Sequence, residues 1–545
     1  MNSSQTKSPL FWCLALAVLA ACYRFWLSSV FWGHEEEDWA NLIHITRIVQ
    51  ALSSGSAFGS NFAELIDLEH MPLFTWLCAL VTLAVGDAHA GSEVVTAFMG
   101  SASVALVTWI GWRWFSPLAG ILAGLLLSFQ PEAALYASSP LRESTYAALM
   151  LAGVALIGQK RTLAAAGFLS LAFLCRFNIA FSVLPALIFW ALWEAKHKAA
   201  ATRLKALRGP LTSALLVLSV VVAWALYYRL HSDSGQWQFW AGVMDKNAGN
   251  AVTDLFPLER LQAISLAFFG LFCWVLPSHF GWLPSALALL AIFRFGKLPR
   301  RDSEAGRWLL IAGLSTLGLL ATTALVSAYP PDHNLYWKWL CPSVPYLALF
   351  AGHGAASLTE MLRSHFPRTN KPLVAAALIF VTWSAWDYST QTQTQLELSE
   401  EYAGNQVRLA RWVEESWPVG SAVLSAHGEI AHLYLAGRPD GPHALDWLQH
   451  APRDNPEALG QWLKTNQVAL LLWFHEEWTG SKEVAGFLEK VPSMQLSAGV
   501  RVELIASLDR SDGAGFTAYQ VRTDAPTFTA STAPPVLHST ATEAR

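Results

Sequence analysis

The sequence predicts a polytopic α-helical membrane protein, with about eleven crossings plus juxtamembrane helices, and a small extracytoplasmic α/β domain at its C-terminus. The first supporting observation is composition: the 545 residues are 53% hydrophobic and only 14% charged. In soluble domains about a quarter of the residues are charged. The second is a series of apolar runs, several of which reach the roughly 18 residues that a membrane helix requires. The third is a change near residue 389, where apolar runs become short and alternate with amphipathic segments.

The apolar segments, with approximate bounds, are 10–32, 72–86, 94–112, 117–130, 144–158, 162–175, 179–193, 211–228, 264–293, 308–327, 340–357 and 372–387. Segment 72–86 is expected to be a juxtamembrane or re-entrant helix, because the basic residues beside the other segments then all lie on one side. If segment 72–86 does cross, the chain has twelve crossings, and one basic residue near the start of the chain lies on the side opposite to the other basic residues.

The basic loops indicate the orientation of the chain. Lys160 and the clusters at 196–208 and 294–307 follow the apolar segments and are expected to be cytoplasmic. The N-terminus then lies inside as a retained signal anchor, whereas loop 33–71 and everything after Tyr388 lie outside. Nearly all loop carboxylates are therefore expected on the outer face.

Three domains are predicted: a transmembrane domain at 1–388, an α/β domain at 389–523 and a disordered tail at 524–545. Short apolar runs at Ala422–Ser425 and Val468–Trp473 predict buried parallel strands. Helices are predicted at Val407–Trp417, Pro456–Lys464 and Lys482–Lys490.

Several classes of function and site are excluded or weakened by what the sequence lacks. The net charge of −4 is uninformative about partners, but the sequence has no basic patch that would suggest a nucleic-acid partner. The six cysteines follow neither a zinc nor a disulfide spacing, and the sequence has no Walker A loop and no HExxH motif. No metal ligands are predicted, although the acidic cluster described next could hold Mg²⁺ or Mn²⁺ through its oxygens.

An acidic run directly follows the first apolar segment: Glu35-Glu36-Glu37-Asp38-Trp39. Like charges repel one another and bury no apolar surface, so their position at the edge of the membrane indicates a function. The alternative is a solvated cap that marks the end of the helix. We expect an interfacial helix after Trp39, which would hold Glu36 and Asp38 just above the bilayer, where a carboxylate can accept the proton of a hydroxyl.

Four further segments carry candidate residues on the expected outer face. Glu69 and His70 precede a proline and either cap a helix or bind substrate. Tyr136, Arg142 and Glu143 follow Pro131, and an adjacent Arg and Glu point to different sides of a helix. Arg176 interrupts a long apolar stretch and either reaches the interface or binds an anion. Lys338, between two tryptophans and near His333, either binds a lipid phosphate or anchors the helix.

Taken in order, these segments resemble the GT-C class of integral membrane glycosyltransferases, in particular bacterial relatives of protein O-mannosyltransferases and of the lipid A aminoarabinose transferase. The likeness rests on four stretches within residues 10–390: Glu35–Trp39, His70–Phe74, Pro131–Glu143 and Lys338–Pro345. Three of them depart from the family pattern. A longer acidic run replaces the Asp-Glu pair and leaves the base ambiguous, Met71 stands where the family has proline, and Lys338-Trp339 replaces Arg-Tyr.

The resemblance implies transfer of a hexosyl or pentosyl group, with inversion, from a polyprenyl-phosphate donor to a lipid, polysaccharide or protein acceptor outside a bacterial inner (plasma) membrane. It implies a base at Asp38 or Glu36, with Glu35 and Glu143 as further catalytic carboxylates. Phosphate would be bound by Arg142, Lys338, Arg176 and His70. Sugar or acceptor would be bound by Trp39, Tyr136, Glu69 and His333.

Two other classes of function are compatible with a polytopic chain. A transporter or flippase of a lipid-linked or anionic substrate predicts ionisable residues near mid-membrane and inverted repeats, and the sequence shows no repeat. A non-catalytic polysaccharide assembly protein predicts binding without transfer.

Overall fold

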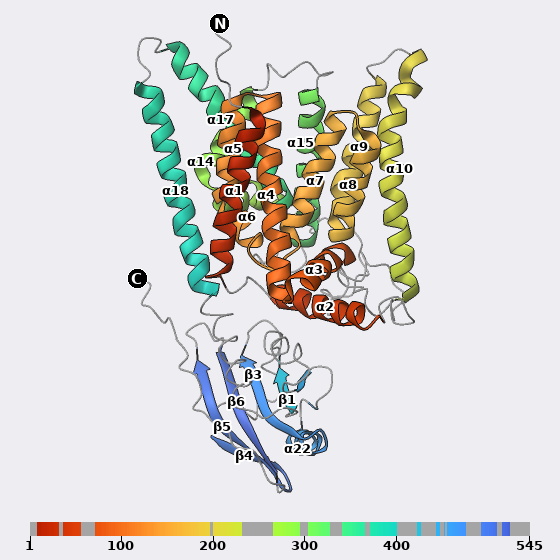
Figure 1. Ribbon diagram of the computed structural model, residues 1–545, viewed down its shortest axis with the longest axis vertical. Helices are drawn as coiled ribbons and strands as arrows, with labels where there is room; N and C mark the ends of the chain where they lie inside the picture. Colours follow the sequence, from red (N-terminus) through yellow and green to blue (C-terminus); the bar gives the residue numbers. More distant parts are fainter. Residues whose placement is uncertain are drawn as a thin grey trace. The chain divides into compact units, whose positions relative to one another are not determined.

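Figure 1 shows the computed structural model of the protein. The structure describes residues 8–31, 36–55, 71–196, 200–231, 265–294, 304–327, 340–365, 371–399, 422–426, 443–446, 452, 455–475, 492–509 and 515–523. The chain divides into two compact units, the first made of Met1–Val30 and Arg47–Gln393 and the second of Phe31–Thr46 and Thr394–Arg545. The division between the units falls inside helix α2 (Glu36–Ser53).

The first unit is a bundle of helices, seen in red to teal in Figure 1. Its helices, besides the end of α2, are α1 (Pro9–Ser28), α3 (Pro72–Val85), α4 (Ala88–Trp114), α5 (Pro117–Phe129), α6 (Pro131–Tyr136), α7 (Glu143–Gly158), α8 (Thr162–Cys175), α9 (Asn178–Lys196), α10 (Ala200–His231), η3 (Leu271–Val275), α13 (Leu276–Phe280), α14 (Trp282–Arg294), α15 (Glu304–Ser327), η5 (Cys341–Ser343), α17 (Val344–His365) and α18 (Lys371–Ser399). They begin and end close to the apolar segments expected from the sequence.

Three of the described helices are long and apolar enough to cross a membrane: Pro9–Ser28, Ala88–Trp114 and Leu207–His231. The bent pair Ser265–Phe280 and Trp282–Ala291 makes a fourth if it is one span. Shorter apolar helices include Pro72–Val85, the segment expected not to cross. The structure thus supports a membrane protein, while the expected number of crossings stays a prediction.

The segment expected as one helix at 264–293 is instead sharply bent. Its two halves meet at Gly281 and differ in direction by 120°. Gly281 has a φ of +95°, a conformation that strongly favours glycine, and Pro284 follows in the first turn of α14. The hydroxyl of Tyr388 donates a hydrogen bond of 3.0 Å to the carbonyl of Phe280 and so satisfies a group freed by the bend.

Helices α4 and α5 approach closely because small residues face each other. A Cβ atom added to Gly120 would lie 2.4 Å from the carbonyl oxygen of Thr108, and one added to Gly111 would lie 2.6 Å from the Cα of Gly120. Small residues at a contact let two helix backbones meet, which favours packing where the surrounding lipid provides no hydrophobic drive. This contact holds the start of α5 in place, and α5 leads directly into α6.

The second unit contains a six-stranded mixed sheet in the order β2-β1-β3-β6-β5-β4. Its strands are β1 (Ala422–Ala426), β2 (His443–Asp446), β3 (Val468–His475), β4 (Ser493–Ser497), β5 (Val500–Asp509) and β6 (Gly515–Thr523). Strands β1 and β3 are parallel, as expected from their apolar runs. The antiparallel strands β4 to β6 were not expected.

Helix α22 (Pro456–Thr465) packs on this sheet, where Leu459 and Leu463 join a core with Leu471, Val500 and Tyr519. It matches the helix expected at Pro456–Lys464. The helices expected at Val407–Trp417 and Lys482–Lys490, and the tail from 524, lie outside the described residues.

Candidate active site

Two prolines shape the segment that joins α5 to α7. Pro131 begins the short helix α6, and the side chain of Gln130 caps it by accepting a hydrogen bond of 2.6 Å from the backbone of Ala133. The amide of Gln130 donates a second bond, of 3.0 Å, to the carbonyl of His279. Pro140 lies in the following turn, and α7 begins at Glu143. Gln130 therefore holds the start of this segment through two hydrogen bonds, and the segment ends at the charged residues Arg142 and Glu143.

Arg176 of the α8–α9 connection forms a buried ion pair with Glu143 of α7. A guanidinium nitrogen of Arg176 donates to Oε1 of Glu143, and the two residues are 5% and 0% exposed. The guanidinium carbon also lies 5.7 Å from the ring centre of Tyr146, which is within the range of a cation–π contact. The sequence left two alternatives for Arg176, the interface or an anion, and the structure adds an internal carboxylate partner.

Arg142 occupies the position before α7 and is buried. Burial, followed by the nearby charge of Arg176, lowers the pKa of Arg142 to about 10, so the side chain stays protonated at neutral pH. Glu143 also acts on it electrostatically. The guanidinium groups of Arg142 and Arg176 therefore both lie close enough to the carboxylate of Glu143 to interact with it electrostatically.

A second contact between polar side chains joins His279 and Glu132. Nδ1 of His279 and Oε1 of Glu132 are 2.8 Å apart, joining α13 to α6. Cys341, the first residue of η5, interacts electrostatically with Glu143, Glu132 and Arg176. The cluster thus combines charged side chains from four separate stretches of the chain around one buried thiol, and we call Glu132, Arg142, Glu143, Arg176 and His279 the charged cluster.

The structure brings together three of the residues predicted from the sequence, namely Arg142, Glu143 and Arg176. For Glu36, Asp38 and Trp39 it describes only the backbone, within α2. The remaining predicted residues of the outer loops lie outside the described residues: Glu35, Glu69, His70, His333 and Lys338. Convergence of the acidic run with the arginines therefore stays a prediction.

Tyr136 was expected to stack on a sugar. Its side chain is only 4% exposed, and it lines a cavity of about 20 Å³. Stacking of Tyr136 on a sugar therefore stays a prediction.

The sequence analysis did not select Arg24, Glu132 or His279. Arg24 was detectable, because a charged residue inside an apolar segment is costly and usually functional. Glu132 and His279 are 147 residues apart, and no sequence spacing relates them. Within the described residues, no group of three or more His, Cys, Asp or Glu side chains is placed to hold a metal ion.

Comparison with known proteins bears on the fold. By sequence the chain matches no family model and no curated protein. Its structure is similar to ArnT from Cupriavidus metallidurans bound to undecaprenyl phosphate, with a TM-score of 0.57 and 13% identity over 93% of this chain and 98% of ArnT. The apo oligosaccharyltransferase from Archaeoglobus fulgidus gives a TM-score of 0.53 and 13% identity over 96% of this chain and 76% of that protein.

The Archaeoglobus enzyme AglB in complex with an inhibitory peptide and a dolichol-phosphate gives a TM-score of 0.50 and 12% identity, over 93% of this chain and 74% of AglB. Sequence identities of 12–13% show similarity of the fold alone. ArnT, a lipid A aminoarabinose transferase, and AglB are both GT-C class members. The motif order therefore predicted the architecture correctly: this chain has the fold of the GT-C integral membrane glycosyltransferases.

Proposed function

We propose that the protein transfers a sugar from a polyprenyl-phosphate donor to an extracytoplasmic acceptor, with inversion at the anomeric carbon. The observation that carries the proposal is the presence of two buried arginines, Arg142 and Arg176, beside Glu143 in a protein with the GT-C fold. Buried guanidinium groups are well suited to a phosphate, because they are always charged and donate several hydrogen bonds.

The solved structures support the choice of donor. ArnT binds undecaprenyl phosphate and AglB binds a dolichol-phosphate. Both ligands are polyprenyl chains that end in a phosphate, so their tails remain in the bilayer while the phosphate reaches the interface. A site that uses such a donor must lie at that level and needs no nucleotide-binding motif, in agreement with the sequence.

In the proposed reaction, the acceptor hydroxyl oxygen bonds to the anomeric carbon as the bond from that carbon to the phosphate oxygen breaks. A carboxylate takes the hydroxyl proton, and the phosphate leaves with the bonding electrons. Arg142 and Arg176 stabilise the charge that develops on the phosphate, assisted by Lys338 and His70. Glu143, expected as a further catalytic carboxylate, is proposed to hold Arg176 in place, because one of its oxygens is bound to Arg176.

We propose Asp38 as the base, with Glu36 as the alternative. The two positions are separated by about 200° around a helix, so only one of them can face a given site. Trp39, Glu69, Tyr136 and His333 remain proposed contacts of the sugar or acceptor.

The test is transfer of radiolabelled sugar from polyprenyl-phosphate donors by membranes that contain the protein. Asp38→Asn should reduce transfer by about 10²- to 10⁴-fold, the range for loss of a general base. Arg142→Ala should reduce kcat by about 10²- to 10³-fold, as when a group that stabilises developing charge is removed. Glu36→Gln should have a smaller effect than Asp38→Asn.

Glu37→Gln is the matched control, because it makes the same change of charge within the same acidic run and is expected to keep near-normal transfer. If Asp38→Asn, Glu36→Gln and Arg142→Ala all keep full activity at normal expression, the assignment of the site is wrong. If labelled lipid crosses the bilayer of proteoliposomes and no transfer occurs, the protein is a transporter or flippase and the proposed reaction is wrong.

A further inference from the structure

The last carbonyl groups of α13, in residues 278–280, are bound by side chains of other parts of the chain, and we call these three residues the α13 terminus. A helix that ends leaves its last carbonyl groups without partners in the helix itself. The hydroxyl of Tyr388 in α18 donates a hydrogen bond of 3.0 Å to the carbonyl of Phe280. The amide of Gln130, which caps α6, donates one of 3.0 Å to the carbonyl of His279. Two adjacent carbonyl groups therefore connect α18 to the start of α6.

Each of these two connections has a second contact beside it. On the α6 side, Oε1 of Glu132 lies 2.8 Å from Nδ1 of His279, so the α6 segment contacts both the ring and the carbonyl of this residue. On the α18 side, the amide nitrogen of Gln391 lies 3.4 Å from the carbonyl oxygen of Ser278, which is a long and weak hydrogen bond. The same nitrogen donates a bond of 3.1 Å to Oδ1 of Asp387. The α13 terminus is therefore fixed from both sides by polar contacts.

The segment that leads from Gln130 to Arg142 is hydrogen-bonded along its length. The backbone N–H of Ala134 donates a bond of 2.9 Å to the carbonyl of Gln130, and the hydroxyl of Ser138 donates one of 2.7 Å to the carbonyl of Ala134. At the other end, the backbone N–H of Tyr146 donates a bond of 3.0 Å to the carbonyl of Arg142. Coupling between distant positions is carried by contiguous hydrogen-bonded and packed elements of this kind. We therefore expect a displacement of Gln130 to move Arg142.

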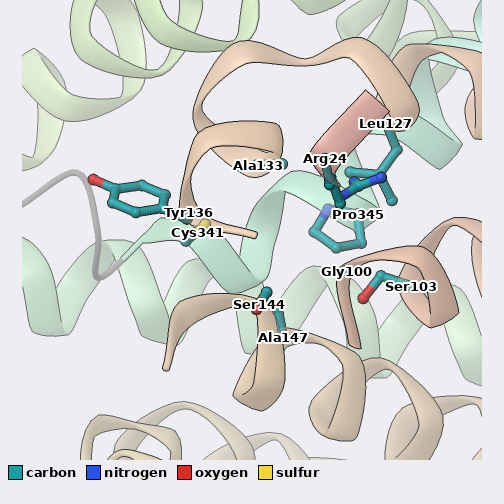
Figure 2. A pocket seen from close by; sticks show the side chains of 10 residues that line it. All are labelled: Arg24, Gly100, Ser103, Leu127, Ala133, Tyr136, Ser144, Ala147, Cys341 and Pro345. Atoms are coloured by element: carbon teal, nitrogen blue, oxygen red, sulfur yellow. The ribbon is translucent and has the colours of Figure 1, made fainter. Parts of the chain in front are cut away.

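The side of this segment that faces α7 is incompletely packed. Figure 2 shows Ala133 and Tyr136 of α6 and Ser144 of α7 on the wall of the cavity of about 20 Å³ described above. Atoms beside such a space lose part of the dispersion attraction that close packing provides. Packing on this side therefore fixes the segment less firmly, and its location depends more on the polar contacts with the α13 terminus.

We propose that Tyr388 is a positioning residue of the reaction. By holding the α13 terminus it fixes Gln130 and the start of α6, and through them the location of Arg142 beside the donor phosphate. This role rests on the proposed function, in which Arg142 stabilises the charge that develops on the phosphate. A displacement of about 1 Å in a reacting centre can lower the rate by about 10²-fold, even when the substitution that causes it is remote.

The first test measures sugar transfer by the full-length protein. Tyr388→Phe removes the hydroxyl and keeps the ring. It should lower kcat by about tenfold with the KM for the donor nearly unchanged, because a displaced Arg142 stabilises the transition state less. Gln130→Met should lower kcat by about 10²-fold, because it also removes the cap of α6. In the double variant the reduction should be smaller than the product of the two single reductions, as expected for residues that act through one another.

The second test needs no substrate. Hydrogen exchange of the purified protein in detergent, followed by mass spectrometry, reports local opening of the backbone. Tyr388→Phe should increase the exchange of residues 131–142 severalfold and leave that of α10 unchanged. Thr390→Val in α18 is the matched control, because its hydroxyl bonds to the carbonyl of Trp386 in its own helix at 3.0 Å. This variant should alter neither the exchange nor kcat.

Three results would overturn the proposal while the proposed function stands. One is transfer by Tyr388→Phe that equals that of the wild type. Another is exchange in residues 131–142 that does not respond to this substitution. The third is a pair of single reductions that multiply in the double variant, because Tyr388 would then not act through Gln130. A wild type that transfers no sugar contradicts the proposed function, and the exchange measurement then decides by itself whether Tyr388 fixes residues 131–142.

Discussion

Arg176 and Arg24 are both buried guanidinium groups of the same helical unit, yet their surroundings differ. Arg176 is bound to the carboxylate of Glu143 and lies near the ring of Tyr146. Arg24 lines a small cavity, and the described residues give two of its nitrogens no hydrogen-bond partner. The comparison shows that the charge of Arg176 is balanced by a fixed internal carboxylate, whereas the described residues supply no such hydrogen-bond partner for two nitrogens of Arg24.

The largest effect is expected from breaking the fixed pair. Arg176→Met should lower the free energy of unfolding by about 3–5 kcal/mol, because Glu143 is left buried without its partner. The double variant Arg176→Met with Glu143→Leu should recover most of this loss. Unfolding by SDS in mixed micelles measures both quantities. Additive effects of the two single substitutions would show that the pair does not act as a unit.

A smaller effect of opposite sign is expected for Arg24. Arg24→Met should raise the free energy of unfolding by about 1–3 kcal/mol, since it removes buried donors that lack partners among the described residues. The same SDS titration provides the measurement. A loss as large as that of Arg176→Met would mean that a carboxylate outside the described residues pairs with Arg24.

The smallest effect is expected at an ion pair of the sheet unit. Arg522 of β6 donates a bond of 2.5 Å to Glu503 of β5, and their side chains are 41% and 31% exposed. Arg522→Ala should change the free energy of unfolding by less than about 1 kcal/mol, because solvent and salt screen such pairs. Unfolding in urea or SDS, followed by a spectroscopic signal of the sheet, measures this change in the free energy of unfolding. A change greater than about 1 kcal/mol would mean that burial does not determine which ion pairs of this protein are strong.

The sequence predicted those parts of the fold that depend on local apolar patterning. Long apolar runs predicted the helices of the first unit, and the apolar strands β1 and β3 were found where they were expected. The bend at Gly281 was missed, because one continuous apolar run does not reveal a change of direction. Strands β4 to β6 were missed because their residues are a mixture of buried and exposed positions with bulges.

For the candidate site, the sequence predicted charged residues and not their partners. Arg142, Glu143 and Arg176 were selected because charges beside apolar runs are costly. The pairing of Glu143 with Arg176, and not with its neighbour Arg142, depends on how α7 packs against α8. The pair of Glu132 and His279 depends on packing between segments far apart in the chain, which a single sequence does not encode in any readable spacing.

The separation of the paired residues along the chain has a consequence for biosynthesis. Glu143 and Arg176 are 33 residues apart, whereas Glu132 and His279 are 147 residues apart. Closing a short loop costs less entropy, and the N-terminal partner pair leaves the ribosome first. We therefore expect α7 and α8 to enter the membrane as a hairpin in which Glu143 and Arg176 are already paired, early in translation. Glu132 can pair with His279 only after α13 has been synthesised, much later in translation. A chain arrested after Arg176 and before His279 would therefore contain the pair of Glu143 and Arg176 but not that of Glu132 and His279.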